Sequence, residues 1–133
     1  MTAALGAVQT AVYARLAGDV TLAAMAPVYD EVPEGTAYPY VTISGLDATP
    51  DNALGELGSS VNITLNVWSK YRGYAQAQRI AARVDALLDH QPLSVAGYRD
   101  VSVLQQALRA VRDPNPEIRR VVAEYQVWLT QEG

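Results

Sequence analysis

The sequence predicts an α+β fold: one domain, residues 1–133, in which helices cover one face of an antiparallel or mixed sheet of about four to five strands. Three observations predict it. Half of the 133 residues are apolar, enough for a core without disulfides. Two segments have helical spacing, and several others alternate as strands do. Segments adjacent in the chain have short connections, which favours antiparallel neighbours with the helices on one face.

The first elements are two helices. An apolar stripe at spacings of three and four predicts a helix from about residue 2 to Gly18, where glycine favours a helix end. Asp19 or Thr21 can cap a second, short helix through Met25, and Pro27 ends it. The stripe of the first helix consists of Leu5, Val8, Val12 and Leu16.

Extended segments are expected at Val28-Tyr29 and over 38–43, where Pro39 favours a strand end or a sheet edge. Residues 45–58 show no periodicity and contain Gly, Pro and acidic residues but no base, so we expect a long loop there.

The clearest strand spans 59–69, because apolar residues alternate with polar ones. Trp68 lies on the opposite face from that apolar stripe, so a sheet with helices on one face leaves Trp68 in need of another partner. Helical spacing then predicts a helix from Tyr71 to about Asp89. The stripe of the strand is Val61, Ile63, Leu65 and Val67, and that of the helix is Ala77, Ile80, Ala81, Val84, Leu87 and Leu88.

Two further strands are predicted, over 99–111 with a β-bulge near 104–106, and over 118–130. The residues between them, Asp113-Pro114-Asn115-Pro116, favour a tight turn. Strands of about eleven to thirteen residues extend roughly 35 to 45 Å, more than a domain of this size spans, so long hairpins must project. Unpaired edges of such hairpins suit contacts with neighbouring copies.

Charge is distributed unevenly along the chain. The net charge of −4 excludes a protein that grips duplex DNA through a basic face. The first sixty residues contain seven acidic residues and one base, whereas the rest contain seven acidic residues and nine bases. Such unequal halves favour a domain with two unlike faces, although the asymmetry can also be accidental. We expect neither a signal peptide nor a membrane-spanning helix, because no apolar run is long enough.

Catalytic patterns are weak. The single histidine, His90, falls at the end of a predicted helix, where the helix dipole accounts for it. There is no cysteine, and the glycine-containing run at 55–60 has no lysine for a phosphate. We therefore expect no enzyme, no metal and no cofactor, with a small enzyme or ligand-binding domain as the alternative from another class.

Aromatic and turn residues are the candidates for contacts between subunits. The chain has eight Tyr and two Trp but no Phe, and Tyr and Trp suit surfaces that are buried on one side and wet on the other. Ordinary half-buried packing is the alternative for each tyrosine. The candidate interface residues are Trp68, Tyr38, Tyr40, Asp113 and Asn115.

The sequence resembles the tail completion family of long-tailed bacteriophages and prophages, also described as tail terminator or tail-to-head joining proteins. The resemblance extends over nearly the whole chain. The residues that carry it are VYDEVPEGTAYPYVTI, ITLNVWSKYRG, AQAQRIAARVDALLDHQPL, VAGYRDVSV and RDPNPEIRRVVAEYQVWL.

This resemblance implies a structural virion protein of the tail neck, assembled in the host cytoplasm. Such proteins form a ring, typically a hexamer, on the head-proximal end of the tail tube, stop its polymerisation and join the filled head. The implied partners are further copies of the chain, the tail tube protein and a head-closure or connector protein, with DNA passing through the lumen without specific binding. Another neck component, such as a head-closure or connector protein, is the alternative within this class.

The acidic 45–58 segment fits a channel that lets DNA pass, because its carboxylates repel phosphate. We expect Asp47, Asp51 and Glu56, with Asn52 beside them, to face the lumen or the tube. Plain solvated disorder of this segment is the alternative.

Overall fold

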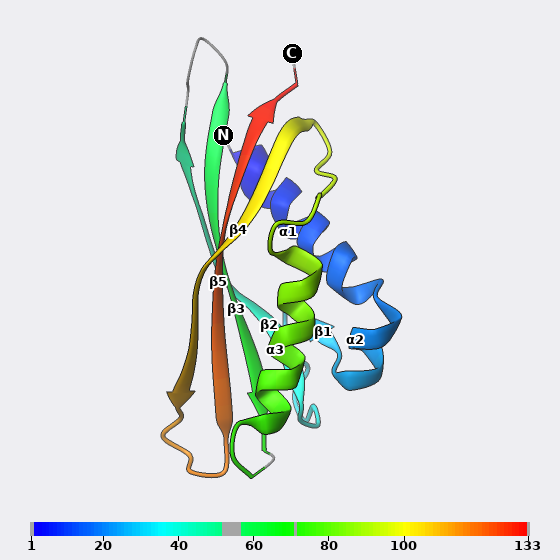
Figure 1. Ribbon diagram of the computed structural model, residues 1–133, viewed down its shortest axis with the longest axis vertical. Coiled ribbons are helices and arrows are strands. Elements are labelled where there is room, and N and C mark those ends of the chain that lie inside the picture. Colours follow the sequence, from blue (N-terminus) through cyan, green and yellow to red (C-terminus); the bar gives the residue numbers. More distant parts are fainter. Residues whose placement is uncertain (1, 52–56, 71, 133) are drawn as a thin grey trace.

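The computed structural model describes residues 2–51, 57–70 and 72–132 and contains a five-stranded mixed sheet. The strand order is β1-β2-β3-β5-β4, with β1 parallel to β2 and the other neighbours antiparallel. All helices lie on one face of the sheet (Figure 1), which confirms the predicted α+β architecture. The elements are α1 (Thr2–Ala17), α2 (Val20–Met25), β1 (Val28–Tyr29), β2 (Tyr40–Pro50), β3 (Gly58–Ser69), α3 (Ala75–Leu88), β4 (Tyr98–Arg112) and β5 (Arg119–Gln131).

The core lies between the helices and one face of the sheet. α1 covers β1, β2 and β3, while α3 covers β3, β5 and β4. The apolar stripes predicted for β3 and α3 are buried in full, and Tyr125 of β5 is among the largest buried side chains. Among the described residues, no helix is long and apolar enough to cross a membrane.

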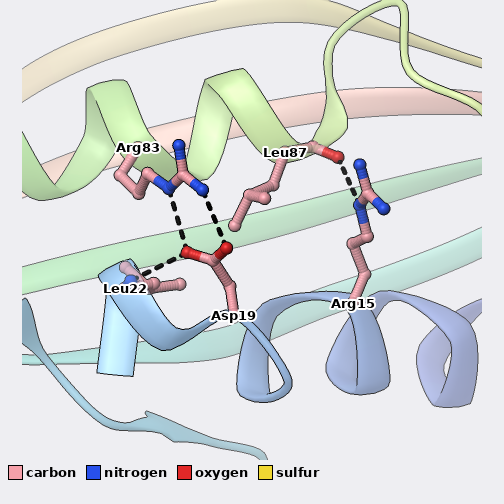
Figure 2. Close-up of polar contacts among 5 residues, drawn as sticks. All are labelled: Arg15, Asp19, Leu22, Arg83 and Leu87. Atoms are coloured by element: carbon pink, nitrogen blue, oxygen red, sulfur yellow. Dashed lines mark hydrogen bonds and ion pairs between the residues drawn. The ribbon is translucent and has the colours of Figure 1, made fainter. Parts of the chain in front are cut away.

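A polar clamp fixes the helices to one another (Figure 2). The carboxylate of Asp19 caps α2 by accepting from the Leu22 N–H at 2.8 Å. It also accepts two hydrogen bonds from the Arg83 guanidinium of α3, at 2.7 and 2.9 Å. The Arg83 bonds lower the pKa of Asp19 to about 2. Nearby, Arg15 of α1 donates from Nε to the Leu87 carbonyl at 3.0 Å, so both ends of the α1–α2 corner are tied to α3.

The predicted loop over 45–58 is too long. β2 continues through Pro50, with a register shift between Ile43 and Gly45, and its residues pair with β3 as far as Pro50 opposite Ser59. A continuous antiparallel partner supplies hydrogen bonds that outweigh the weak strand preference of Gly, Asp and Pro. The bulge predicted in the 99–111 strand is confirmed by a register shift between Gln105 and Ala107.

Candidate assembly surfaces

The face of the sheet away from the helices is polar. Asn62 and Thr64 of β3 lie beside Gln126 and Glu124 of β5 on this face. Glu124 forms an ion pair with Arg109 of β4 at 2.5 Å. These side chains are exposed or half-buried, so most of the open face is a wet surface that does not require an apolar cover.

One end of this face carries a cluster of four aromatic side chains, which we call the aromatic cluster. Tyr40 is central, with ring centroids 5.0 Å from Tyr38, 6.1 Å from Tyr29 and 6.4 Å from Trp68. The structure therefore brings together three of the predicted interface residues. Burial, with a further contribution from the neighbouring Tyr38 hydroxyl, raises the pKa of Tyr40 to about 12, so its hydroxyl stays protonated at neutral pH.

Two cations lie over rings of the aromatic cluster. The Lys70 ammonium lies 4.8 Å from the Tyr38 ring centroid, and the Arg120 guanidinium lies 5.2 Å from that of Trp68. The Trp68 indole N–H donates to the Thr42 hydroxyl at 3.0 Å. Trp68 is on the face away from the helices, as predicted, but it is half-buried because Tyr40 and Arg120 cover part of it.

Sequence reasoning missed Arg120. Its position alternates with the buried stripe of β5, which places it on the same face as Trp68. That parity was visible in the sequence. The pairing of Trp68 with Arg120 was not, because it depends on the register between β3 and β5.

The β4–β5 turn lies at the end of the sheet where β3 ends (Figure 1). Because Trp68 of β3 is opposite Arg120, just after this turn, the turn and the aromatic cluster share that end. Asp113 accepts from the Asn115 N–H at 2.9 Å, and Asn115 accepts from the Glu117 N–H at 3.0 Å. Both side chains therefore shape the turn. Beside it is a cavity of about 560 Å³ lined by Tyr74, Arg112, Arg119 and turn residues.

The acidic candidates lie at the opposite end of the sheet. Asp47 is exposed on the open face and accepts from the Asn62 amide at 3.0 Å. Asp51 follows β2, is exposed, and donates its backbone N–H to the Gly58 carbonyl at 2.9 Å. Asn52 and Glu56 lie outside the described residues. Of the predicted lumen residues, Asp47 and Asp51 therefore lie farther along the strands than the aromatic cluster, towards the other end of the sheet.

Both edges of the sheet have stretches without a further strand on their outer side. β4 is an edge strand of 15 residues, paired on one side with β5. The segment after α3 occupies the middle of its outer side, because the Val103 carbonyl accepts from the His90 N–H at 2.9 Å and the Gln105 N–H donates to the Asp89 carboxylate at 2.8 Å. At the other edge, β1 pairs only with Val41 and Thr42, so the described part of β2 from Ile43 to Pro50 has no strand on its outer side. Unpaired strand edges bind other strands readily.

The two edges also differ in charge. Asp30, Glu31 and Glu34 follow β1 and are all exposed. On β4, Arg112 is exposed near its end, while Arg109, also exposed, forms its ion pair with Glu124 on the open face. The two edges therefore differ in the sign of their exposed charges.

Comparison with known proteins gives these surfaces a context. The sequence matches the family model of the tail completion protein gp17 over residues 10–130. The chain belongs to this family. Tail completion proteins are structural parts of the virion, so the structural virion role that the resemblance implied is confirmed, as is location in the virion. A search of curated proteins gave no match.

Two solved structures resemble this tail completion protein along nearly its full length. A chain from the virion of a native gene transfer agent particle superposes with a TM-score of 0.83 and 27% identity, covering 94% of this chain and 96% of its own. The gp17 protein of bacteriophage SPP1 superposes with a TM-score of 0.62 and 24% identity, covering 98% and 92%. At 24% identity, the likeness to the SPP1 protein shows a shared fold.

Proposed function

We propose that the chain is a tail terminator. Copies of it form a ring on the head-proximal end of the tail tube, stop addition of tube subunits and join the tail to the head. The observation that carries the ring is the pair of unlike edges on one sheet: β4 with exposed arginines, and β1–β2 with exposed carboxylates.

A contact between unlike edges is heterologous, since two different patches of the same chain meet. Repeating such a contact closes a ring when the rotations about one axis add up to a full turn, whereas a contact between like edges stops at a dimer. The part of β4 beyond Gln105 in one subunit can pair with the free side of β2 in the next, and the opposite charges favour this contact over one between like edges. We propose a hexamer, as the family resemblance implies.

We further propose that the acidic end of the β2–β3 hairpin faces the channel. Asp47 and Asp51 are exposed there, and Asn52 and Glu56 follow in the sequence. Carboxylates repel phosphate over about one Debye length, roughly 8 Å at physiological salt. A channel lined in this way lets DNA pass without holding it. Replacing Asp47 and Asp51 with Lys should leave tails complete but slow DNA release, and the matched Asn pair should not.

The other end of the sheet is proposed as a contact surface, with Trp68, Tyr38 and Tyr40 in the aromatic cluster and Asp113 and Asn115 in the turn. Exposed Lys70 beside Tyr38 gives this end a basic character that contrasts with the acidic hairpin. A subunit with unlike ends suits a position between two different neighbours, the tail tube protein and a head-closure or connector protein.

Deletion of the gene tests the proposal. A terminator that is missing allows the tube to grow, so electron microscopy should show tails longer than normal that lack heads. A protein that acts only in head closure would leave tails of normal length beside filled heads, and that result would refute termination. Complementation with the unchanged gene is the control and should restore tail length.

A further inference from the structure

The outer surface of the α1–α2 layer carries no charge over its described part. The two charged side chains within residues 4–27, Arg15 and Asp19, are both bonded to α3. Tyr13 is 42% exposed and Val20 is 84% exposed. The outward face of a surface helix normally carries charged and polar residues, so this surface without charge is suited to a contact. Its exposed residues are Gly6, Thr10, Tyr13, Ala14, Ala17, Gly18, Val20, Thr21, Ala23, Ala24 and Pro27.

A second apolar feature lies between α3 and β4. A groove of about 270 Å³ is present there, and Leu108, at 48% exposure, is one of its walls. This volume is below that of a pocket for a drug-sized ligand and suits one or two protein side chains. Its apolar lining is Ala81, Ala82, Leu108, Ala110 and Val121, with Gln78, Asp85 and Arg109 as polar neighbours.

These two features lie at opposite edges of the same layer. α1 covers the β1–β2 side and α3 covers the β4 side. They are also level with each other along the strands, because one row of paired residues crosses the sheet from β1 to the groove. That row is Val28, Val41, Val67, Val121 and Ala110.

Tyr13 lies near the β1 end of this row. The Gln9 amide donates to the Asp30 carboxylate, two residues after Val28, at 2.7 Å. Tyr13 follows Gln9 by one helical turn and shares its side of α1. Subunits placed side by side without a large shift along the strands would therefore bring Tyr13 of one to the groove of the next.

We propose that the α3–β4 groove of each subunit receives Tyr13 and the uncharged α1 surface of the neighbouring subunit. The occupant is a second copy of this chain. The inference rests on the ring proposed above and adds a helical-layer contact to its strand edges. Charge supports this occupant, because exposed Asp30 and Glu31 beside α1 would approach exposed Arg112 and Arg79 beside the groove.

Paired cysteines test this contact, since the chain contains none of its own. In tails carrying Tyr13→Cys together with Leu108→Cys, mild oxidation should link neighbouring copies into a ladder on a denaturing gel. The two positions lie at opposite edges of one subunit, too far apart for a bridge within it. The matched control combines Tyr13→Cys with Thr64→Cys on the open face and should give at least about tenfold less linked chain.

The outcomes separate the two proposals. Rings visible by electron microscopy without the Tyr13–Leu108 link would overturn the groove contact and leave the ring standing. Absence of rings in wild-type tails would overturn both. A link from Leu108→Cys to a different protein would show another occupant and overturn the proposal. Thermal melts should show that both cysteine variants fold. If they do not, Ala14→Cys with Ala82→Cys replaces the Tyr13→Cys and Leu108→Cys pair. A link between positions 14 and 82 then supports the contact.

Discussion

Removal of the Tyr125 hydroxyl should destabilise the fold by a predictable amount. Tyr125 is 1% exposed, and its hydroxyl donates to the Asp85 carboxylate of α3 at 2.9 Å. The same carboxylate oxygen accepts from the Gln105 amide at 2.6 Å, beside the β4 bulge. Burial raises the pKa of Tyr125, so the hydroxyl remains a donor across the working pH range. The Asp85 carboxylate of α3 thus joins β5 through Tyr125 and β4 through Gln105.

The change Tyr125→Phe keeps the ring and removes only this donor. A hydrogen bond to a charged group contributes about 1.5–3 kcal/mol. Because Asp85 is half-buried and keeps Gln105, we expect the lower part of that range, about 1.5–2 kcal/mol. An unfolding entropy of about 2.1 cal/mol/K per residue converts this loss to roughly 5–7 °C in Tm for a chain of this length.

Thermal and urea unfolding of the purified protein measure this loss. Tyr13→Phe is the matched control, because Tyr13 is exposed, and it should change stability by less than about 0.5 kcal/mol. In a double-mutant cycle with Asp85→Ala, the coupling between the two positions should be about 1 kcal/mol or more. A coupling near zero would show that the hydroxyl does not stabilise the fold through Asp85.

Three further predictions concern other parts of the molecule. The pKa of Asp19 is lowered to about 2 in the fold. Its stabilising pairing with Arg83 is therefore present above about pH 4 and is lost as the pH falls towards 2. Between about pH 5 and 2, Tm should fall less in Asp19→Asn than in wild type, and parallel curves would contradict this. Trp68→Ala should reduce incorporation into tails more than it reduces soluble monomer, and loss of soluble protein would instead show that Trp68 mainly stabilises the fold. Gly58→Ala should destabilise the fold by about 1–3 kcal/mol, because a Cβ there would lie 2.3 Å from the Asp51 carbonyl oxygen. Gly6→Ala, with open space around it, should instead stabilise α1 by about 0.5–1 kcal/mol. Chemical denaturation distinguishes the two signs.

Local periodicity predicted most of the elements. The alternation of Val61 to Val67 and the helical stripe of α3 each identified both the element and its buried side. Asp19 was correctly predicted as one of two possible caps for α2. The pairing of distant strands was beyond reach, because β5 inserts between β3 and β4, and only tertiary packing decides that order.

For the candidate surfaces too, local sequence predicted some features, whereas others depend on tertiary packing. The face occupied by Trp68 followed from parity within one strand, whereas its contact with Arg120 required the register between two strands. The strand over Gly45–Pro50 was missed because its stability comes from β3 rather than from its own residues. The proposed role of Tyr13 had no signal in the sequence, because α1 has no charged stripe to mark its outer side.

The uninterrupted register of the central strands also determines how the subunit responds to force. β3 and β5 are paired residue by residue from Gly58 opposite Thr130 to Ser69 opposite Arg119, and both run along the longest axis of the molecule (Figure 1). Tension along that axis loads all of these hydrogen bonds in shear at once, because they lie perpendicular to the strands. Tension across the sheet would instead separate the pairs one after another. The subunit should therefore resist stretching along its length far better than peeling from either edge.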